Sequence, residues 1–259
     1  MRRTQLRYSY RRHLPAHRVW LTGLVLSRES RRRIDRTTWL GELRRDCEDK
    51  YDKVWAPLYG EGKTGLYDNT THLRFIQEFL SLLPAQATIL VAACGAGRYT
   101  SFLLEKGHSV LGIDQSRGML DRAKAKYPGV RFEKIGLQEM AYQGKFDGVI
   151  CVDAMENVSP EDWSLVLANF HRALKPGGYL YFTAETIENV DDEEEIKQAF
   201  ERAQTAGLPV VYGENPDDDV YHYHPTNGQI KDFARQAGFD VLQEANGEIW
   251  YFHVLAQKL

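Results

Sequence analysis

A glycine turn and an aspartate 19 residues after its first glycine give the sequence its clearest chemical signal. Gly95 and Gly97 follow the apolar run 88–92 and open a helical pattern. Glycine lets a backbone approach a ligand closely, and a helix N-terminus offers free N–H groups. Asp114 ends the next apolar run, where its carboxylate can accept hydrogen bonds from both hydroxyls of a ribose. We therefore expect a nucleoside-containing ligand here. The alternatives are an ordinary turn and, for Asp114, a helix N-cap.

A second set of residues could take a proton from an acceptor or orient a cationic one. Glu156 ranks first as a catalytic candidate, because it follows the apolar run 146–152 at the expected carboxyl edge of a sheet. His224 precedes the last helical segment and ranks second, and His253 lies in the last apolar run. The alternatives are a solvent-facing position for Glu156 and a structural or surface role for each histidine.

The elements that must position these residues alternate in type. Continuous apolar runs between amphipathic helical patterns are typical of a parallel sheet covered on both faces. Asn246-Gly247 separates the last two runs and is a strong hairpin signal. We therefore predict an α/β fold with a doubly wound, seven-stranded sheet, mostly parallel, that ends in an antiparallel hairpin. The predicted strands are 88–92, 109–113, 130–134, 146–152, 179–183, 239–244 and 249–256, and the predicted helices include 98–106, 117–126, 160–174, 191–206 and 226–237.

The chain is expected to have three parts. Residues 1–36 carry eleven arginines and only two acids, a net charge of +9. We predict that they form a flexible, dispensable extension; an organelle transit segment, an arm attracted to RNA or membranes, and sequence translated upstream of the natural start are alternatives. Residues 37–84 should form a helical N-terminal cap. Residues 85–259 should form the main domain, with a further cap insertion at about 185–224.

Composition excludes several classes of protein. The longest apolar run near the start, 19–26, is far short of the ~20 residues that span a bilayer. Cys47, Cys94 and Cys151 show no CxxC spacing, so we expect neither disulfides nor a metal site, and a reducing, cytoplasmic location. Residues 37–259 carry a net charge of −12, which argues against a nucleic-acid partner.

Several stretches together resemble the class I S-adenosylmethionine-dependent methyltransferases. They are 90–98, Asp114, 146–153, 174–178 and 237–239, and the resemblance extends over about 39–259. It implies a Rossmann-like fold, S-adenosylmethionine as cofactor and methyl transfer as the activity.

The resemblance also implies a role for individual residues. Segment 93–97 would pass beneath the methionine part of the cofactor, and Asp114 would hold the ribose. Asp153 and the residues after it would line the space beside the transferable methyl group. The residues implied to bind the cofactor are Ala93, Cys94, Gly95, Gly97, Asp114, Gln115, Met119, Leu137, Gln138 and Asp153.

The function that we predict is methyl transfer to a small-molecule acceptor. The two cap regions are rich in aromatic residues, and a closed aromatic cap suits a small organic molecule better than a polymer. One alternative is a methyltransferase for RNA or protein that docks through the arginine-rich extension. Another is a cofactor-binding protein that does not methylate, because Val91, Ala93 and Leu137 depart from the family pattern. A nicotinamide dehydrogenase fits least, since Thr100 replaces the third glycine of its turn.

Overall fold

The computed structural model describes residues 34–58, 70–189, 193–216, 220–247 and 250–259. The chain divides into two units, residues 1–34 and residues 35–259, and the described residues other than Ile34 all lie in the second. The predicted extension up to residue 33 and residues 59–69 of the predicted cap lie outside the described residues.

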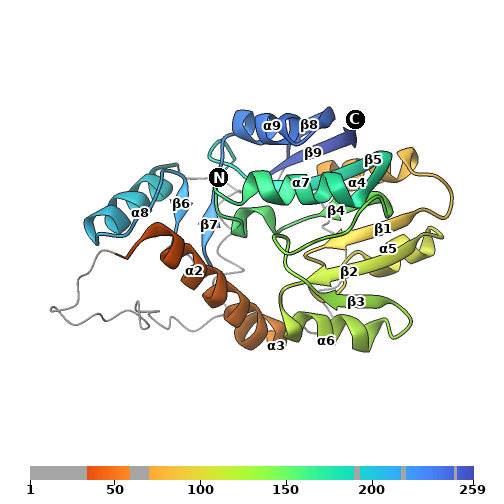
Figure 1. Ribbon diagram of the computed structural model, residues 1–259, viewed down its shortest axis with the longest axis horizontal. Coiled ribbons are helices and arrows are strands. Elements are labelled where there is room, and N and C mark those ends of the chain that lie inside the picture. The colour runs from red at the N-terminus through yellow and green to blue at the C-terminus, as the bar shows by residue number, and fades with distance from the viewer. Residues whose placement is uncertain (1–33, 59–69, 190–192, 217–219, 248–249) are drawn as a thin grey trace. The chain divides into compact units, whose positions relative to one another are not determined.

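A seven-stranded sheet forms the centre of the second unit (Figure 1). The strand order is β3-β2-β1-β4-β5-β9-β8. β1 to β5 run parallel, whereas β9 is antiparallel to both β5 and β8. This topology confirms the predicted fold class. The strands are β1 (Thr88–Ala92), β2 (Ser109–Asp114), β3 (Arg131–Lys134), β4 (Phe146–Cys151), β5 (Leu174–Glu185), β8 (Phe239–Asn246) and β9 (Tyr251–Lys258).

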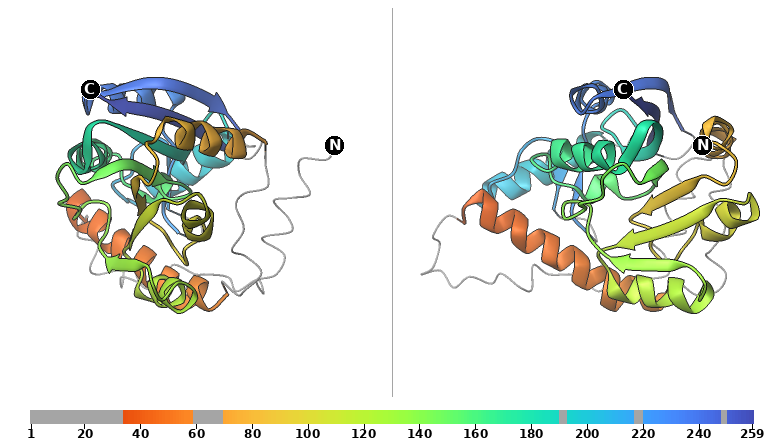
Figure 2. Two further views of the ribbon diagram at one scale, coloured as in Figure 1. Left: turned by 90° about the vertical axis from the view of Figure 1, so that its right-hand side faces the viewer. Right: turned by 45° about the vertical axis from the view of Figure 1, so that its right-hand side comes forward.

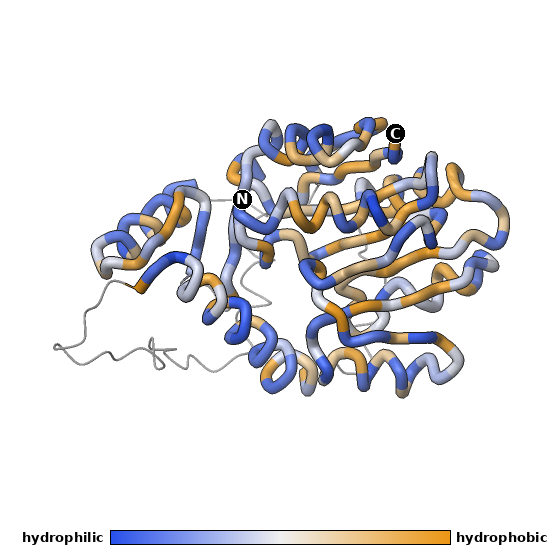
Figure 3. Tube along the Cα trace, viewed as in Figure 1, coloured by the Kyte–Doolittle hydropathy of each residue, from blue (hydrophilic) through white to orange (hydrophobic). Residues whose placement is uncertain are grey.

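Helices cover both faces of the sheet, as the apolar strands predict (Figures 1 and 2). Neighbouring residues on a strand point to opposite faces. Tyr181 of β5 packs in a core cluster with Phe75 and Phe79 of α4, whereas Phe182 meets the Trp163 ring of α7. Hydrophobic residues are concentrated along the central strands (Figure 3). The helices are α4 (Thr70–Leu82), α5 (Thr100–Glu105), α6 (Arg117–Lys126), α7 (Trp163–Ala173), α8 (Glu193–Thr205) and α9 (Asn227–Gln236), with a 3-10 turn, η3, at Met155–Asn157.

The N-terminal helix begins one residue before the predicted boundary of the cap. α2 (Arg36–Lys50) starts after Asp35, whose side chain accepts a hydrogen bond from the Thr38 N–H as the N-cap. The helix continues through a π-helical turn, η1 (Tyr51–Trp55), into α3 (Ala56–Leu58). Asp35 and Arg36 therefore belong to the folded unit and not to the predicted extension.

Two further features differ from the sequence prediction. α4, which was expected in the cap, packs on β5 and β9, because Phe75, Ile76 and Phe79 bury an apolar face in the core. The insertion contains a short antiparallel pair, β6 (Glu214–Asn215) and β7 (His222–Tyr223), which no sequence pattern indicated. Among the described residues, no helix is both long enough and apolar enough to cross a bilayer.

Candidate active site

A cavity of about 540 Å³ lies where the carboxyl ends of β1, β2 and β4 meet α2. The strand order reverses between β1 and β4, and ligands of open α/β sheets bind at such a switch point. The structure brings nine of the ten predicted cofactor residues to this cavity: Ala93, Cys94, Gly95, Asp114, Gln115, Met119, Leu137, Gln138 and Asp153. Gly97 does not line it.

The glycine turn after β1 combines an open position with a crowded one. Gly95 and Gly97 both have positive φ, +52° and +82°, which glycine adopts without strain. A Cβ at Gly97 would lie 3.0 Å from the Tyr127 ring, so this glycine serves the local packing. A Cβ at Gly95 would meet nothing within 4 Å. The turn thus leaves free space directly above Gly95, where a ligand can approach the backbone.

Asp114 joins the ends of β1 and β2 at the cavity. Its Oδ2 accepts a hydrogen bond from the Gly95 N–H at 2.8 Å, and its Oδ1 accepts one from the Ser116 N–H at 2.8 Å. Each carboxylate oxygen can accept a second bond. Burial raises the pKa of this carboxyl to about 6, although the backbone N–H groups act in the opposite direction. The N-cap of α6 is Ser116, so the alternative role of Asp114 as an N-cap is wrong.

A fixed loop carries two of the predicted cofactor residues, Leu137 and Gln138, at the cavity. Asn169, buried in α7, donates hydrogen bonds to the backbone oxygens of Leu137 at 2.9 Å and Gln138 at 3.1 Å. The Gln138 amide in turn donates to Asp162 at 3.2 Å. These bonds hold the loop after β3 against α7, and Gln115 lines the cavity from the end of β2.

Asp153, after β4, is held from three directions. Its own N–H donates to the Thr183 hydroxyl at 3.1 Å, and the Tyr251 hydroxyl donates to its carboxylate. An Arg98 nitrogen lies 3.6 Å from the same carboxylate. Its backbone has a φ of +61°, a conformation that aspartate tolerates better than most residues. Asp153 therefore presents a fixed carboxylate to the cavity.

Glu156 follows the carboxyl end of β4, as the sequence prediction expects, but it is buried and does not line the cavity. Its side chain is 3% exposed, and it is not among the residues that line the cavity. Burial raises the pKa of the Glu156 carboxyl well above its ordinary value, and the neighbouring Asp153 and Glu185 carboxylates raise it further. The η3 turn folds this residue inward, where it lies close to Asp153 and Glu185.

His224 and His253 are also buried away from the cavity. His224 is 4% exposed and lies 3.2 Å from a Glu185 oxygen. His253 belongs to a buried chain of rings in which the Tyr181 hydroxyl contacts its Nδ1 at 3.0 Å and His72 Nδ1 at 3.1 Å. Burial lowers the pKa of His72 to about 3, so His72 itself is neutral at pH 7. The structural alternative for His253 is therefore the one that the fold supports.

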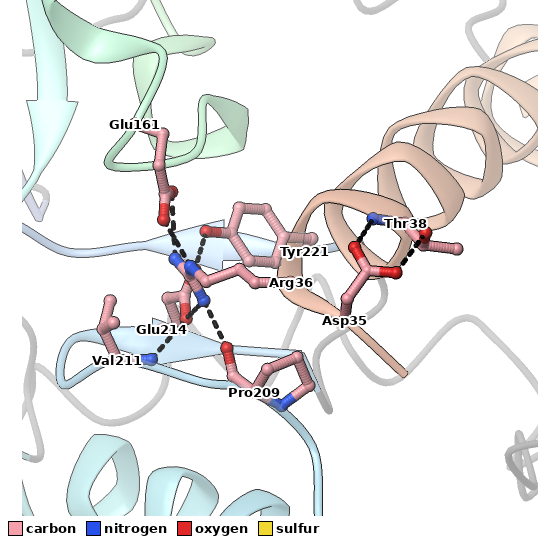
Figure 4. A network of polar contacts seen from close by, with 8 residues as sticks. All are labelled: Asp35, Arg36, Thr38, Glu161, Pro209, Val211, Glu214 and Tyr221. Atoms are coloured by element: carbon pink, nitrogen blue, oxygen red, sulfur yellow. Dashed lines mark hydrogen bonds and ion pairs between the residues drawn. The ribbon is translucent and has the colours of Figure 1, made fainter. Parts of the chain in front are cut away.

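A network of polar contacts that no sequence pattern indicated closes the cavity (Figure 4). Two Arg36 nitrogens lie 2.9 and 3.0 Å from the carboxylate oxygens of Glu214, which is fully buried. Arg36 also donates to Glu161 at 2.9 Å and to the Pro209 carbonyl at 2.5 Å. The Tyr221 hydroxyl donates to Glu214 at 2.5 Å. These bonds tie α2 to the insertion and to the loop before α7, and nothing in the arginine-rich sequence singles out Arg36.

Residues 89–178 match the family model described as a methyltransferase domain. The chain therefore contains a methyltransferase domain with the class I fold. S-adenosylmethionine is the methyl donor of that family, so the predicted family, enzyme class and cofactor are confirmed. An uncharacterized methyltransferase from Oceanobacillus iheyensis is 24% identical over 197 residues, which cover 70% of this chain and 91% of the relative.

Other relatives match a shorter part of the chain or match it at lower sequence identity. A ubiquinone biosynthesis O-methyltransferase from Pseudomonas paraeruginosa is 31% identical over 121 residues, 44% of this chain and 50% of that protein. The chain thus spans about half the length of several curated relatives that it matches. The structure of a Burkholderia thailandensis 1,6-didemethyltoxoflavin-N1-methyltransferase, with bound 1,6-didemethyltoxoflavin and S-adenosylhomocysteine, has a TM-score of 0.59 at 18% identity. That match covers 87% of this chain and 91% of the other.

The residues present fit the cofactor of the family. The free space above Gly95 admits a ligand against the backbone, and Asp114 offers two carboxylate oxygens that can accept further hydrogen bonds. Gln115 after the end of β2 and Met119 in the first turn of α6, with Leu137 and Gln138 from the loop after β3, supply polar and apolar surface for a heterocycle.

Cofactor affinity of the methyltransferase should depend on pH through Asp114. If Asp114 holds the ribose as predicted, the ribose hydroxyls need its ionised carboxylate, whereas burial favours the protonated form up to about pH 6. Binding of S-adenosylhomocysteine should therefore be nearly constant above pH 7 and weaken by up to ~10-fold for each pH unit below 6. Calorimetric titrations from pH 5 to 8 measure this, and Asp114→Asn is the control that should show a flat profile. An identical slope in that variant would assign the titration to another group.

Proposed function

We propose that this methyltransferase transfers a methyl group from S-adenosylmethionine to a small organic molecule that binds between the strand ends and α2. Closure of the cavity carries the proposal. α2 lines the cavity together with the glycine turn, and the Arg36–Glu214 pair fastens the start of α2 to the insertion. A cavity of about 540 Å³ suits a small ligand, whereas a polymer needs an open groove. We also propose that α2, α3 and the insertion at 185–224 form the cap.

The acceptor side of the proposed site is aromatic and internally braced. The Tyr51 hydroxyl donates to the Asn157 side chain at 3.2 Å, and the Asn157 amide donates to the Tyr221 backbone oxygen at 3.0 Å. Asn157 therefore links the end of α2 to the insertion. Leu40 and Leu43 of α2 add apolar surface to the same cavity. These walls favour an organic acceptor with an apolar or aromatic body.

The chemistry asks mainly for positioning. The bound cofactor supplies an electrophilic methyl group on a sulfonium. The protein has to hold the acceptor in line, which is worth up to ~7–11 kcal/mol in well-oriented reactions. Where the acceptor must lose a proton, Asp153 is the carboxylate with a fixed position at the cavity after β4.

The relatives support a small acceptor, because the names of two of them specify ubiquinone biosynthesis and 1,6-didemethyltoxoflavin. The acidic charge of residues 37–259 disfavours RNA. Methyl-labelled S-adenosylmethionine should be incubated with the full chain and, in separate reactions, with small-molecule, RNA and protein fractions of one cell extract. We expect label in the small-molecule fraction. Label only in RNA or protein would overturn the proposed acceptor class, and binding without transfer would favour a non-methylating protein.

Asp153 and Glu156 can be separated by a matched pair of variants. If Asp153 receives or directs a proton of the acceptor, Asp153→Asn should lower turnover by ~10²-fold or more. Glu156→Gln keeps a neutral side chain of the same size, which burial already favours, so its turnover should change much less. Turnover on the identified acceptor, with S-adenosylhomocysteine affinity as the control, measures both. A large loss in Glu156→Gln alone would restore Glu156 as the proton-handling residue.

A further inference from the structure

Three side chains that carry possible metal-ligand atoms come together within the insertion at 185–224. Glu185 ends β5, His222 lies in β7, and His224 follows it. One ligand atom from each lies within 4.8 Å of the others. The two imidazole rings are nearly perpendicular, at 86°, with centroids 5.8 Å apart. His224 Nε2 lies 3.2 Å and His222 Nδ1 3.8 Å from the same Glu185 oxygen.

Local structure explains the convergence. Residues two apart on an extended segment point to the same side, so His222 and His224 share a face. Tyr223 between them points the other way and packs edge-on against Trp163. The Ile187 N–H donates to the Pro225 carbonyl at 3.2 Å, which holds the histidine segment against the end of β5.

The hydrogen bonds of His224 leave two hydrogen-bond acceptors facing each other. Its Nδ1 lies 3.2 Å from the Gly213 carbonyl, and a carbonyl only accepts, so Nδ1 carries the proton. In a neutral ring Nε2 is then a lone pair, and it faces the Glu185 carboxylate, which is also an acceptor. Two acceptors at 3.2 Å need a shared proton or a shared cation. A backbone carbonyl on the second nitrogen is the usual partner of a metal-binding histidine.

The surroundings favour a cation. The Glu156 carboxyl, nine-tenths buried, has one oxygen without a hydrogen-bond partner among the described residues. The carboxyl groups of Asp153, Glu156 and Glu185 thus lie close together, and an Arg98 nitrogen lies 3.6 Å from the Asp153 carboxylate. A second positive charge near Glu185 would lower the cost of keeping these carboxylates together.

We propose that Glu185, His222 and His224 bind a divalent transition-metal ion. Two imidazoles and one carboxylate are the donor set of many Zn²⁺ sites, and three protein ligands leave positions open for water or a further oxygen ligand. The ion joins the end of β5 to the segment after β6, whose Glu214 is the partner of Arg36. The ion therefore holds the insertion at His222 and His224, whereas Arg36 holds it at Glu214. The proposal does not depend on the identity of the methyl acceptor.

Zn²⁺ itself is the probe. The untagged full chain, first treated with a chelator and dialysed, should bind one equivalent of Zn²⁺ in a calorimetric titration. His222→Ala and His224→Ala should each weaken that binding by at least ~100-fold, since even a lost outer partner of a metal ligand costs up to that much. His108→Ala, in the loop before β2, is the matched control and should bind like the wild type.

A proton shared between His224 and Glu185 is the competing explanation, and the same experiment separates the two. Absence of one-equivalent binding by the wild-type chain would overturn the proposal, whatever the variants do. Unchanged binding by the His222→Ala/His224→Ala double variant would overturn it as well. Glu185→Gln keeps the size of the side chain, so it tests the site even if the alanine variants misfold. Its melting temperature should no longer rise with Zn²⁺, whereas that of the wild type should.

Discussion

Replacing Arg36 with alanine should lower the free energy of unfolding by about 3 kcal/mol. Removing one partner of a buried ion pair leaves an uncompensated charge and costs about 3–5 kcal/mol. The lower end applies because the Arg36 side chain is 23% exposed, whereas Glu214 is fully buried. The change would also free the start of α2 from the insertion, so the cavity would lose the contact that closes it. Urea denaturation at pH 7 measures the loss.

Glu161→Ala is the matched control for this prediction. Glu161 pairs with the same guanidinium but is 47% exposed, and exposed ion pairs contribute only ~0–1 kcal/mol. A chain that starts at Thr37 should lose more stability than Arg36→Ala, because it also lacks the Asp35 N-cap, whereas a chain that starts at Ile34 should keep the stability of the folded unit. An Arg36→Ala effect as small as that of Glu161→Ala would show that Tyr221 and the backbone satisfy Glu214 without the arginine.

Replacing Asp114 with alanine should weaken the binding of S-adenosylhomocysteine by ~5- to 150-fold, the equivalent of ~1–3 kcal/mol for a lost charged hydrogen-bond acceptor. Asp114 is the carboxylate at the end of β2, and its oxygens already order the turn at Gly95. The variant removes both the proposed hydrogen-bond acceptor for the ribose and the bond that orders the turn at Gly95. Isothermal titration calorimetry at pH 7.5 measures the affinity.

Asp147→Ala controls for the structural part of that loss. Asp147, near the start of β4, also accepts a backbone hydrogen bond, from the Thr88 N–H at 2.8 Å. This bond lies at the amino end of β1, whereas Asp114 lies near its carboxyl end. Its loss should lower stability and leave the affinity for S-adenosylhomocysteine within about twofold of the wild type. Equal affinity in the Asp114→Ala variant and the wild type would remove Asp114 from the proposed site.

The sheet and the cofactor side could be predicted because their signals are local. β1 and β4 are apolar on both faces, since helices cover both, and such runs are visible without knowledge of their partners. The glycine turn is also a local signal, because the backbone at Gly95 and Gly97 has positive φ, which favours glycine. Adjacent strand ends then bring Gly95 and Asp114 together by topology alone.

The acceptor side could not be predicted, because its contacts join distant parts of the chain. Arg36 stood in a basic run, and its partner Glu214 follows 178 residues later. Glu156 was assigned to the acceptor because it follows a strand, but a 3-10 turn buries it. The strongly apolar face of α4 was assigned to the cap, whereas the sheet provides a larger apolar surface to cover. The pairing of β6 with β7, which brings His222 and His224 to Glu185, has no pattern of its own.

The central claim is that the free space above Gly95 holds the cofactor, and a pair of glycine variants tests it most directly. Gly95→Leu places a side chain at φ +52° in the cavity, and Gly107→Leu places one at φ +83° in the loop after α5, again with nothing within 4 Å of its Cβ. Both positions have positive φ, but only the first side chain fills the cavity. The measurement is calorimetric titration with S-adenosylhomocysteine. We predict binding by the wild type and Gly107→Leu and its loss in a folded Gly95→Leu; equal binding by both variants would contradict the account.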